Sequence, residues 1–306
     1  MMRRLHAPFH RLLLAFVLWL PLAAAAYDVA LVMSQRSGSA QAFADAFMRE
    51  AVASGHRVTD VGEAGGVLDE PAMARADLVV ANGEAALAAV LSGPPRPTLG
   101  VMLGRAGYDA LRARYPQAEL SAFTLDQPAV RQLRLLRAVL PESKRVGALF
   151  SNGRPDAQPL RDAAAASGLD LATATVDAEA ELIIRLEAAL RRADAFVAIP
   201  DPLLSQPASA RVILLTSYRF QKPVFAFSRA YVDAGALAAV FTTPSQAATD
   251  VVKWMDGQPA GRLTLPSPRA PASYEIAVNR QVARALGISL PPDAELLRLM
   301  KKGEKS

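Results

Sequence analysis

Two segments of this 306-residue chain, 27–123 and 144–240, repeat one order of strands and helices. Three landmarks recur: an apolar run that ends in serine, an apolar run that begins with Ala-Asp, and a strand led by proline. They lie at 29–34, 76–81 and 97–102 in the first copy, and at 146–151, 193–198 and 223–227 in the second. Strands that alternate with helical stretches are typical of parallel sheets. The sequence therefore predicts an α/β fold of two Rossmann-like lobes with a ligand cleft between them.

The periodicity of apolar residues places the elements of both lobes. In the first lobe we expect strands at 27–33, 57–61, 77–81 and 98–103, and helices at 39–54, 70–75, 84–91 and 106–114. In the second we expect strands at 145–150, 169–176, 194–199 and 223–227, and helices at 155–167, 179–192 and 204–220.

Three segments are expected to cross between the lobes: 121–124 with the helix 128–140 after it, 240–244, and the proline-rich stretch 266–274. The first lobe is then 27–123 with part of 244–268, and the second is 124–240. A strand and helix within 274–290 join one of the two sheets. Bending a few backbone angles in three crossings would close the lobes on a ligand.

The first 26 residues have the layout of a cleaved signal peptide. Arg3, Arg4 and Arg11 precede an apolar run at 12–22, and four alanines at 23–26 supply a cleavage site. The alternative is a membrane anchor, but a span needs about 20 apolar residues and this run is shorter. We expect export with cleavage near Ala26.

Composition excludes several function classes. Cleavage lowers the 34 basic residues to 31 against 29 acidic ones, so the mature chain carries no strong basic excess for nucleic acid. The absence of cysteine excludes a thiol nucleophile, a thiolate metal site and a lipidated cysteine anchor. His56 is the one histidine left after cleavage, and we expect it to be solvated or to cap a helix. We therefore expect no enzyme, no metal and no cofactor.

Ligands of open parallel sheets bind beyond the carboxyl ends of the strands, where helix N-termini expose N–H groups. The repeated pattern predicts a ligand site from polar and aromatic residues at those ends: Ser34, Gln35, Ser37, Asn82, Gly83, Arg105, Ser151, Asn152, Asp201, Ser228, Arg229 and Tyr231. Serine, asparagine and glycine offer neutral hydrogen bonds and close backbone approach. The same residue types also cap helices, so capping remains an alternative for each.

Arg229 is the sharpest single candidate, because a guanidinium after a buried strand can hold a ligand carboxylate in a bidentate pair. The alternative is a salt bridge to Asp201 or Asp233. Asp201 itself either accepts from a ligand ammonium or caps the helix that follows Pro202.

The stretches 201–204 (Asp-Pro-Leu-Leu), 222–232 (Lys-Pro-Val-Phe-Ala-Phe-Ser-Arg-Ala-Tyr-Val) and 233–237 (Asp-Ala-Gly-Ala-Leu) resemble one known family. It is the family of ABC transporter substrate-binding proteins of the tryptophan/tyrosine type, with the type I periplasmic binding-protein fold. Two further stretches are similar, 140–147 and 274–279 with 285–288.

This resemblance implies a monomer that captures a small molecule in the periplasm and delivers it to an inner-membrane permease. Its relatives bind aromatic amino acids, which would suit Arg229 and Asp201 as partners of an amino acid or related carboxylate. The chain departs from the family at 104–108, where relatives usually carry Asp-Pro, so another polar or amphipathic ligand is equally open. An alternative function is a periplasmic sensing module that signals to a membrane receptor or sensor kinase.

Overall fold

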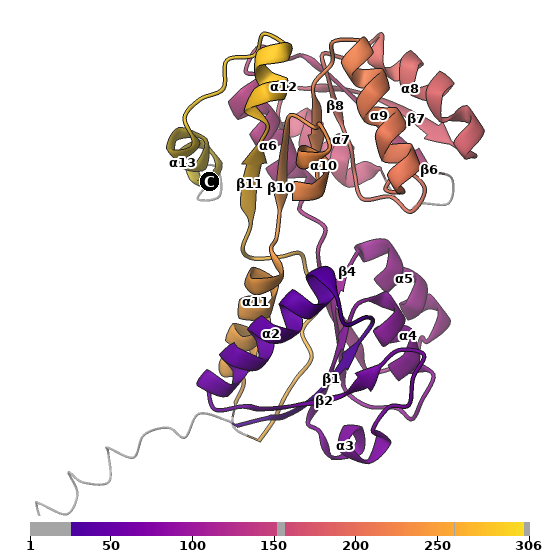
Figure 1. Ribbon diagram of the computed structural model, residues 1–306, viewed down its shortest axis with the longest axis vertical. Coiled ribbons are helices and arrows are strands. Elements are labelled where there is room, and N and C mark those ends of the chain that lie inside the picture. The colour runs from indigo at the N-terminus through magenta and orange to yellow at the C-terminus, as the bar shows by residue number, and fades with distance from the viewer. Residues whose placement is uncertain (1–25, 152–156, 260, 303–306) are drawn as a thin grey trace, which may run out of the picture.

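The computed structural model describes residues 26–151, 157–259 and 261–302. The predicted signal peptide, apart from Ala26, lies outside these residues. Figure 1 shows two lobes joined by a narrow connection. Each lobe is a mainly parallel sheet flanked by helices.

The first lobe contains five parallel strands in the order β2-β1-β3-β4-β5. The strands are β1 (Asp28–Met33), β2 (Arg57–Glu63), β3 (Leu78–Asn82), β4 (Thr98–Leu103) and β5 (Leu120–Thr124). The helices between them are α2 (Gly38–Ala53), α3 (Glu70–Arg75), α4 (Glu84–Leu91) and α5 (Arg105–Arg114).

The second lobe contains six strands in the order β11-β10-β9-β8-β6-β7. The strands are β6 (Arg145–Ser151), β7 (Asp170–Val176), β8 (Ala195–Val197), β9 (Val224–Ala226), β10 (Ala238–Phe241) and β11 (Glu275–Val278). The helices are α6 (Ala129–Val139), α7 (Gln158–Ala166), the 3-10 turn η2 (Glu179–Glu181), α8 (Leu182–Leu190), α9 (Pro207–Arg219), α10 (Arg229–Asp233), α12 (Arg280–Ala285) and α13 (Asp293–Lys302).

The predicted fold is confirmed, and the duplication extends to topology. Read from β7, the second sheet runs β7-β6-β8-β9-β10, which is the order of the first sheet read from β2. Only β11 is added, and it pairs antiparallel with β10. Because corresponding strands occupy corresponding places, their carboxyl ends lie at equivalent edges of the two sheets.

The aspartate of the repeated Ala-Asp landmark makes the same kind of hydrogen bond in both lobes. Asp77 accepts a hydrogen bond from the backbone N–H of Asp28 at 2.8 Å, which ties the start of β3 to the start of β1. Asp194 accepts from the backbone N–H groups of Lys144 and Arg145, both at 2.8 Å, and ties β8 to β6. The repeated Ala-Asp landmark is therefore an anchor between the first and third strands of each lobe.

Helix α11 (Pro244–Asp256) follows β10 but packs in the first lobe, beside α2. Its Ala248, Val251 and Met255 are fully buried in the same cluster as Phe43 and Phe47 of α2. The sequence predicts a crossing at 240–244 and part of 244–268 in the first lobe, but it was not interpreted as a helix. The missed signal is a capping box, in which Thr243 accepts from the N–H of residue 246 and the side chain there accepts from the N–H of Thr243.

After α11 the chain returns to the second lobe, where α12 and α13 cover the outer end of the sheet. Leu296 and Met300 of α13 are buried in the cluster that α6 also forms. Lys301 and Lys302 form the exposed last turn of this helix. No helix within the described residues has both the length and the apolar character that a membrane crossing requires.

Candidate functional site: a pocket between the lobes

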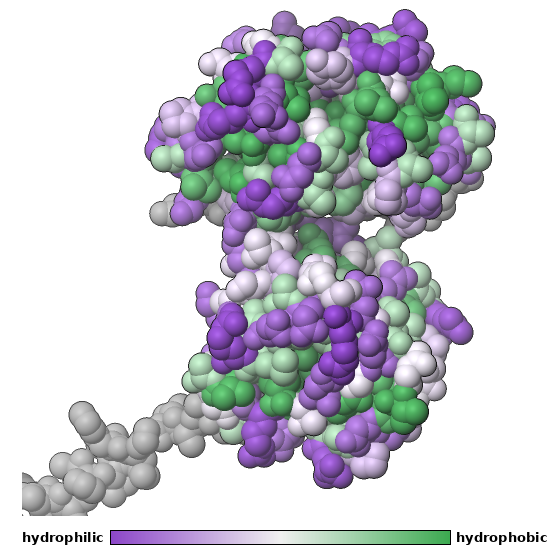
Figure 2. All heavy atoms as spheres, in the orientation of Figure 1, coloured by the Kyte–Doolittle hydropathy of each residue, from purple (hydrophilic) through white to green (hydrophobic). Residues whose placement is uncertain are grey.

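A pocket of about 520 Å³ lies where the two lobes meet. Figure 2 shows the molecule narrowed to a waist at this level. The pocket is lined from the first lobe, from the crossings and from the second lobe: Arg105, Ala106, Asp109, Thr124, Asp126, Gln127, Pro128, Ala129, Gln132, Phe150, Pro159, Leu160, Ile199, Pro200 and Ala270. These residues follow the carboxyl ends of β4, β5, β6 and β8, the edge at which parallel sheets bind ligands. We call it the interlobe pocket.

The first-lobe wall is the beginning of α5. The backbone N–H of Arg105 donates to the carboxylate of Asp126 at 2.5 Å, so an unpaired N–H of the first turn is satisfied by the first crossing. The Arg105 side chain is half-exposed and donates to both oxygens of Asp109, at 2.8 and 3.0 Å. The Arg105 guanidinium at this wall of the pocket is therefore already paired with a carboxylate.

The second-lobe wall is largely apolar. Phe150 ends β6, Leu160 lies in α7, and Ile199 and Pro200 follow β8. One amide, that of Gln132, is almost fully buried here and lies 3.5 Å from the carbonyl oxygen of Ala198. An apolar wall that faces charged and amide groups suits a molecule with both apolar and polar parts.

The predicted residues of the first lobe lie together at the ends of β1 and β3. The Ser34 hydroxyl accepts from the backbone N–H of Ala86 at 2.9 Å, in the first turn of α4. The Asn82 side chain is fully buried and donates to the carbonyl of Ala40 at 2.8 Å, while its own oxygen has no partner within the described residues. Gly83 has φ +100°, a conformation that favours glycine.

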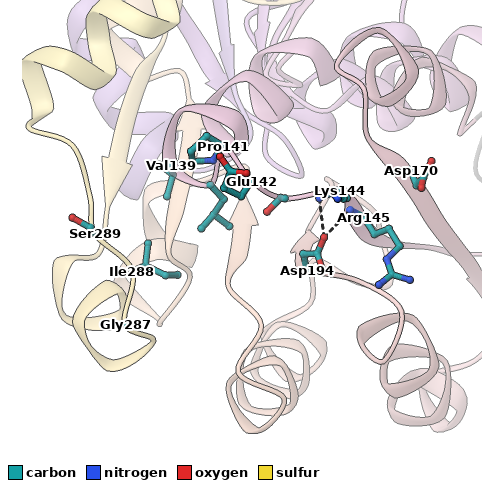
Figure 3. Close-up of a pocket in the computed structure, with 12 residues that line it drawn as sticks. Val139, Pro141, Glu142, Lys144, Arg145, Asp170, Asp194, Gly287, Ile288 and Ser289 are labelled. Atoms are coloured by element: carbon teal, nitrogen blue, oxygen red, sulfur yellow. Dashed lines mark hydrogen bonds between the residues drawn. The ribbon is translucent and has the colours of Figure 1, made fainter.

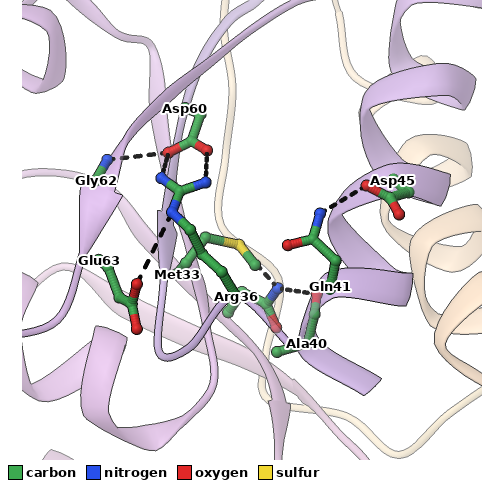
Figure 4. Close-up of polar contacts among 9 residues, drawn as sticks. Met33, Arg36, Ala40, Gln41, Asp45, Asp60, Gly62 and Glu63 are labelled. Atoms are coloured by element: carbon green, nitrogen blue, oxygen red, sulfur yellow. Dashed lines mark hydrogen bonds and ion pairs between the residues drawn. The ribbon is translucent and has the colours of Figure 1, made fainter. Parts of the chain in front are cut away.

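Gln35 and Ser37 are exposed in the loop between β1 and α2. Ser37 is the N-cap residue of α2 but makes no side-chain capping bond. Between them, Arg36 donates to both carboxylate oxygens of Asp60, at 2.6 and 2.9 Å, and this pair holds the loop against β2 (Figure 4). Burial acts to raise the pKa of Asp60, but the hydrogen bonds from Arg36 and from the backbone of Gly62 outweigh it, so this pKa lies below its usual value.

The predicted residues of the second lobe fall into two groups. In the first, Ser151 donates to the carboxylate of Asp201 through its backbone N–H and its hydroxyl, both at 2.9 Å. Asp201 is 2% exposed and also accepts from the backbone N–H groups of Leu203 and Leu204. This carboxylate thus has four donors among the described residues, and Asn152, the next residue in the sequence after Ser151, lies outside them.

The second group lies around α10, away from the interlobe pocket. Ser228 caps this helix by accepting from the N–H of Tyr231 at 3.2 Å. Arg229 is exposed, with its guanidinium 5.5 Å from the centre of the Phe241 ring, and no ion pair within the described residues joins it to Asp201 or Asp233. The buried Tyr231 hydroxyl has no hydrogen-bond partner among the described residues, and burial raises its pKa above the usual value.

Of the predicted site residues that the structure describes, only Arg105 lines the interlobe pocket itself. The polar lining that the sequence analysis missed is Asp109, Asp126, Gln127 and Gln132. Two signals were available. The first crossing is also the carboxyl end of a fifth parallel strand, and Gln132 stands among the buried leucines of α6.

A larger cavity, of about 740 Å³, lies at the opposite edge of the second-lobe sheet, as Figure 3 shows. It includes Lys144, Arg145 and Asp194, whose hydrogen bonds form the anchor between β6 and β8. Burial acts to raise the pKa of Asp194, and its two backbone hydrogen bonds outweigh that effect and lower it. Since this edge carries the amino ends of the strands, it is not the ligand edge of the fold.

His56 is buried, contrary to the expectation that it is solvated or caps a helix. Its ring stacks on Tyr27, Nδ1 accepts from the backbone N–H of Tyr27 at 3.2 Å, and Nε2 lies 3.0 Å from the carboxylate of Asp256. Both ring nitrogens are used, so neither is placed to activate a hydroxyl nucleophile. No cluster of three potential metal ligands occurs in the described part of the chain.

Two duplicated α/β lobes, three crossings and a lined pocket between them define a two-lobe solute-binding protein. The family described as ABC transporter substrate binding protein matches residues 124–299, and the chain belongs to this family. The resemblance to ABC transporter substrate-binding proteins found in the sequence is thereby confirmed. A comparison with curated proteins gives no match.

Solved structures support the same fold. A ligand-free, open substrate-binding protein with adhesive properties from Clostridium difficile is 16% identical, covers 88% of this chain and 97% of its own, and gives a TM-score of 0.65. An ABC domain in complex with L-Trp from Streptococcus pneumonia is 17% identical, with 90% and 98% covered and a TM-score of 0.59. A conserved domain protein from Vibrio cholerae is 19% identical, with the same coverage and TM-score.

Proposed function

We propose that this protein is the periplasmic solute-binding component of an ABC transporter. It takes up one small polar or amphipathic molecule between its lobes, closes on it by bending at the three crossings, and releases it unchanged to an inner-membrane permease. Family membership supports the solute-binding role and the permease as partner.

The observation that carries this proposal is the composition of the interlobe pocket. Its lining comes from both lobes and from the first and third crossings, so a bound molecule contacts both lobes and two of the three crossings. Phe150, Leu160 and Ile199 offer apolar contact, while Arg105, Asp109 and the two buried glutamines offer hydrogen bonds. An amino acid or a related carboxylate with an apolar side chain combines the two kinds of group and fits a volume of about 520 Å³.

A thermal-shift screen with the 20 L-amino acids, simple carboxylates, nucleosides and sugars tests this function. A cognate ligand at 100 times its Kd is expected to stabilise the folded state by about 2.7 kcal/mol, since it binds only that state. A melting temperature that none of these compounds raises would count against solute binding. Boiled and refolded protein serves as the control for a solute retained from the cell.

Export is tested by the mass of the protein recovered from the periplasm. Cleavage near Ala26 removes the arginine-led apolar segment at the N-terminus, so intact-mass spectrometry should give a chain that begins close to Tyr27. Tyr27 is buried, with its hydroxyl bonded to the carbonyl of Pro259 at 2.6 Å, so a chain that begins here keeps this contact of the first lobe. Recovery of the full-length chain in the cytoplasm alone would contradict the proposed location.

A further inference from the structure

A chain of hydrogen bonds runs across all three crossings. The side-chain amide nitrogen of Gln127, in the first crossing, donates to the hydroxyl of Thr242 in the second at 2.7 Å. That hydroxyl donates to the carbonyl oxygen of Ser273 in the third at 2.6 Å. The side chains of Gln127 and Thr242 therefore join the three crossings to one another.

The direction of each bond in this chain is fixed by chemistry. A carbonyl oxygen only accepts, so the Thr242 proton must point to Ser273, and the hydroxyl oxygen must then accept from the amide of Gln127. At the other end, the Gln127 oxygen accepts from the guanidinium of Arg131 at 3.1 Å. Both ends of the Gln127 amide are thus held in one orientation.

Each lobe also contributes one side chain that bonds to the third crossing next to Ser273. Asp250 of α11, on the first lobe, is 8% exposed and accepts from the backbone N–H groups of Ala272 and Ser273 and from the hydroxyl of Ser273, at 3.0 to 3.3 Å. Arg131 of α6, on the second lobe, donates to the carbonyl of Pro271 at 2.8 Å. Rotation of one lobe against the other must bend the backbone between Pro271 and Ser273. It must therefore also strain the hydrogen bonds that join Gln127, Thr242 and Ser273.

Gln127 also lines the interlobe pocket, whereas Thr242 does not. We propose that Gln127 is the residue that couples the contents of the pocket to the hinge, through Thr242. Its amide nitrogen carries two protons and gives one to Thr242, so a ligand carbonyl or carboxylate that accepts the other acts on all three crossings. The inference rests on the proposed function, because closure on a solute is what the coupling transmits.

Substitution Thr242→Val tests the coupling without touching the pocket. Valine has the same shape but breaks both bonds, so the ratio of lobe arrangements in the ligand-free protein is expected to change about tenfold, equivalent to about 1.4 kcal/mol. The native chain has no cysteine, so Val52→Cys in α2 and Ile184→Cys in α8, both exposed, give a unique pair of dye sites, one on each lobe. Single-molecule energy transfer between the dyes then reports the distribution of lobe arrangements.

Two matched variants make the result decisive. Thr242→Ser keeps the hydroxyl and is expected to restore the parent distribution. Thr249→Val removes a threonine hydroxyl that bonds to Glu50 and to the carbonyl of Ser245 at 2.7 and 3.0 Å, entirely on the first-lobe side, and is expected to leave the distribution unchanged. A Thr242→Val distribution equal to that of the parent would overturn the coupling, as would an equal shift in Thr249→Val.

The same labelled proteins separate this inference from the proposed function. If the 20 L-amino acids and simple carboxylates of the screen leave the parent distribution unmoved while Thr242→Val shifts it without ligand, the hinge chain stands and the proposed function loses support. If a compound closes the parent and Thr242→Val responds with the same midpoint concentration, solute binding stands and the coupling through Thr242 is refuted.

Discussion

Substitution Asp201→Asn is expected to lower the free energy of unfolding by about 3 kcal/mol. The carboxylate is 2% exposed and accepts four hydrogen bonds, from the N–H and hydroxyl of Ser151 and from the N–H groups of Leu203 and Leu204. Asparagine replaces one accepting oxygen by a donating NH₂ group, which then faces donors. Buried donors left without a partner cost about 1–3 kcal/mol each, and bonds to a charged group are the stronger kind.

The urea midpoint of unfolding measures this effect, with Asp233→Asn as the matched control because Asp233 is exposed at the end of α10. The experiment also decides between the two roles that the sequence left open for Asp201. The structure replaces the predicted helix cap by a turn: Asp201 bonds to the N–H groups of Leu203 and Leu204, and α9 begins only at Pro207 after its N-cap Gln206. This role in holding the turn predicts the loss of stability. A role in holding a ligand ammonium predicts a protein as stable as the Asp233→Asn control that has lost affinity for its solute.

Substitution Gly83→Ala is expected to cost about 3 kcal/mol of stability. Gly83 has φ +100°, and a Cβ atom there would overlap the hydroxyl oxygen and the Cβ of Ser34. An unfavourable backbone conformation costs about 1–3 kcal/mol. Displacing Ser34 also breaks its hydrogen bond to the N–H of Ala86, worth about 0.5–1.5 kcal/mol, and so frees the first turn of α4.

Gly65→Ala is the control for Gly83→Ala, because Gly65 has a similar φ of +86° and open space where its Cβ would stand. We expect it to cost about 1 kcal/mol, the backbone term alone. Thermal and urea unfolding of the two variants isolate the steric term as the difference between them. Equal losses would mean that Ser34 yields freely and does not hold the turn between β3 and α4.

The fold was largely predictable because strand ends and helices repeat with local signals. Apolar runs that end in serine marked β1 and β6, and the Ala-Asp pairs marked β3 and β8. Helix α11 was not predicted because Pro244 was interpreted as the end of a crossing, although proline is well suited to the first turn of a helix. That part of 244–268 joins the first lobe was expected from the sequence, and the contacts of α11 with α2 give the physical reason.

The edge of the sheets at which the interlobe pocket lies was predictable, but the polar lining of the pocket was not. Ser34, Ser151 and Asp201 do lie at the carboxyl ends of strands, and each engages the chain around it. Whether a side chain at such an edge faces the other lobe depends on how the lobes are oriented, as Arg229 shows by lying beside Phe241. Gln127 and Gln132 reach the pocket because α6 begins at the hinge, which is a property of the assembled lobes.

The return of the chain to its first lobe through α11 has a consequence for biogenesis. The α2 side of that lobe lacks part of its cover until Val251 and Met255 have been synthesised, and both lie after β6 to β10 in the chain. The core of the first lobe is therefore completed only after the strands β6 to β10 of the second lobe have been synthesised. A protease that cuts one of the three crossings leaves the two lobes connected by the other two. A single cut in the narrow connection between the lobes therefore does not separate them.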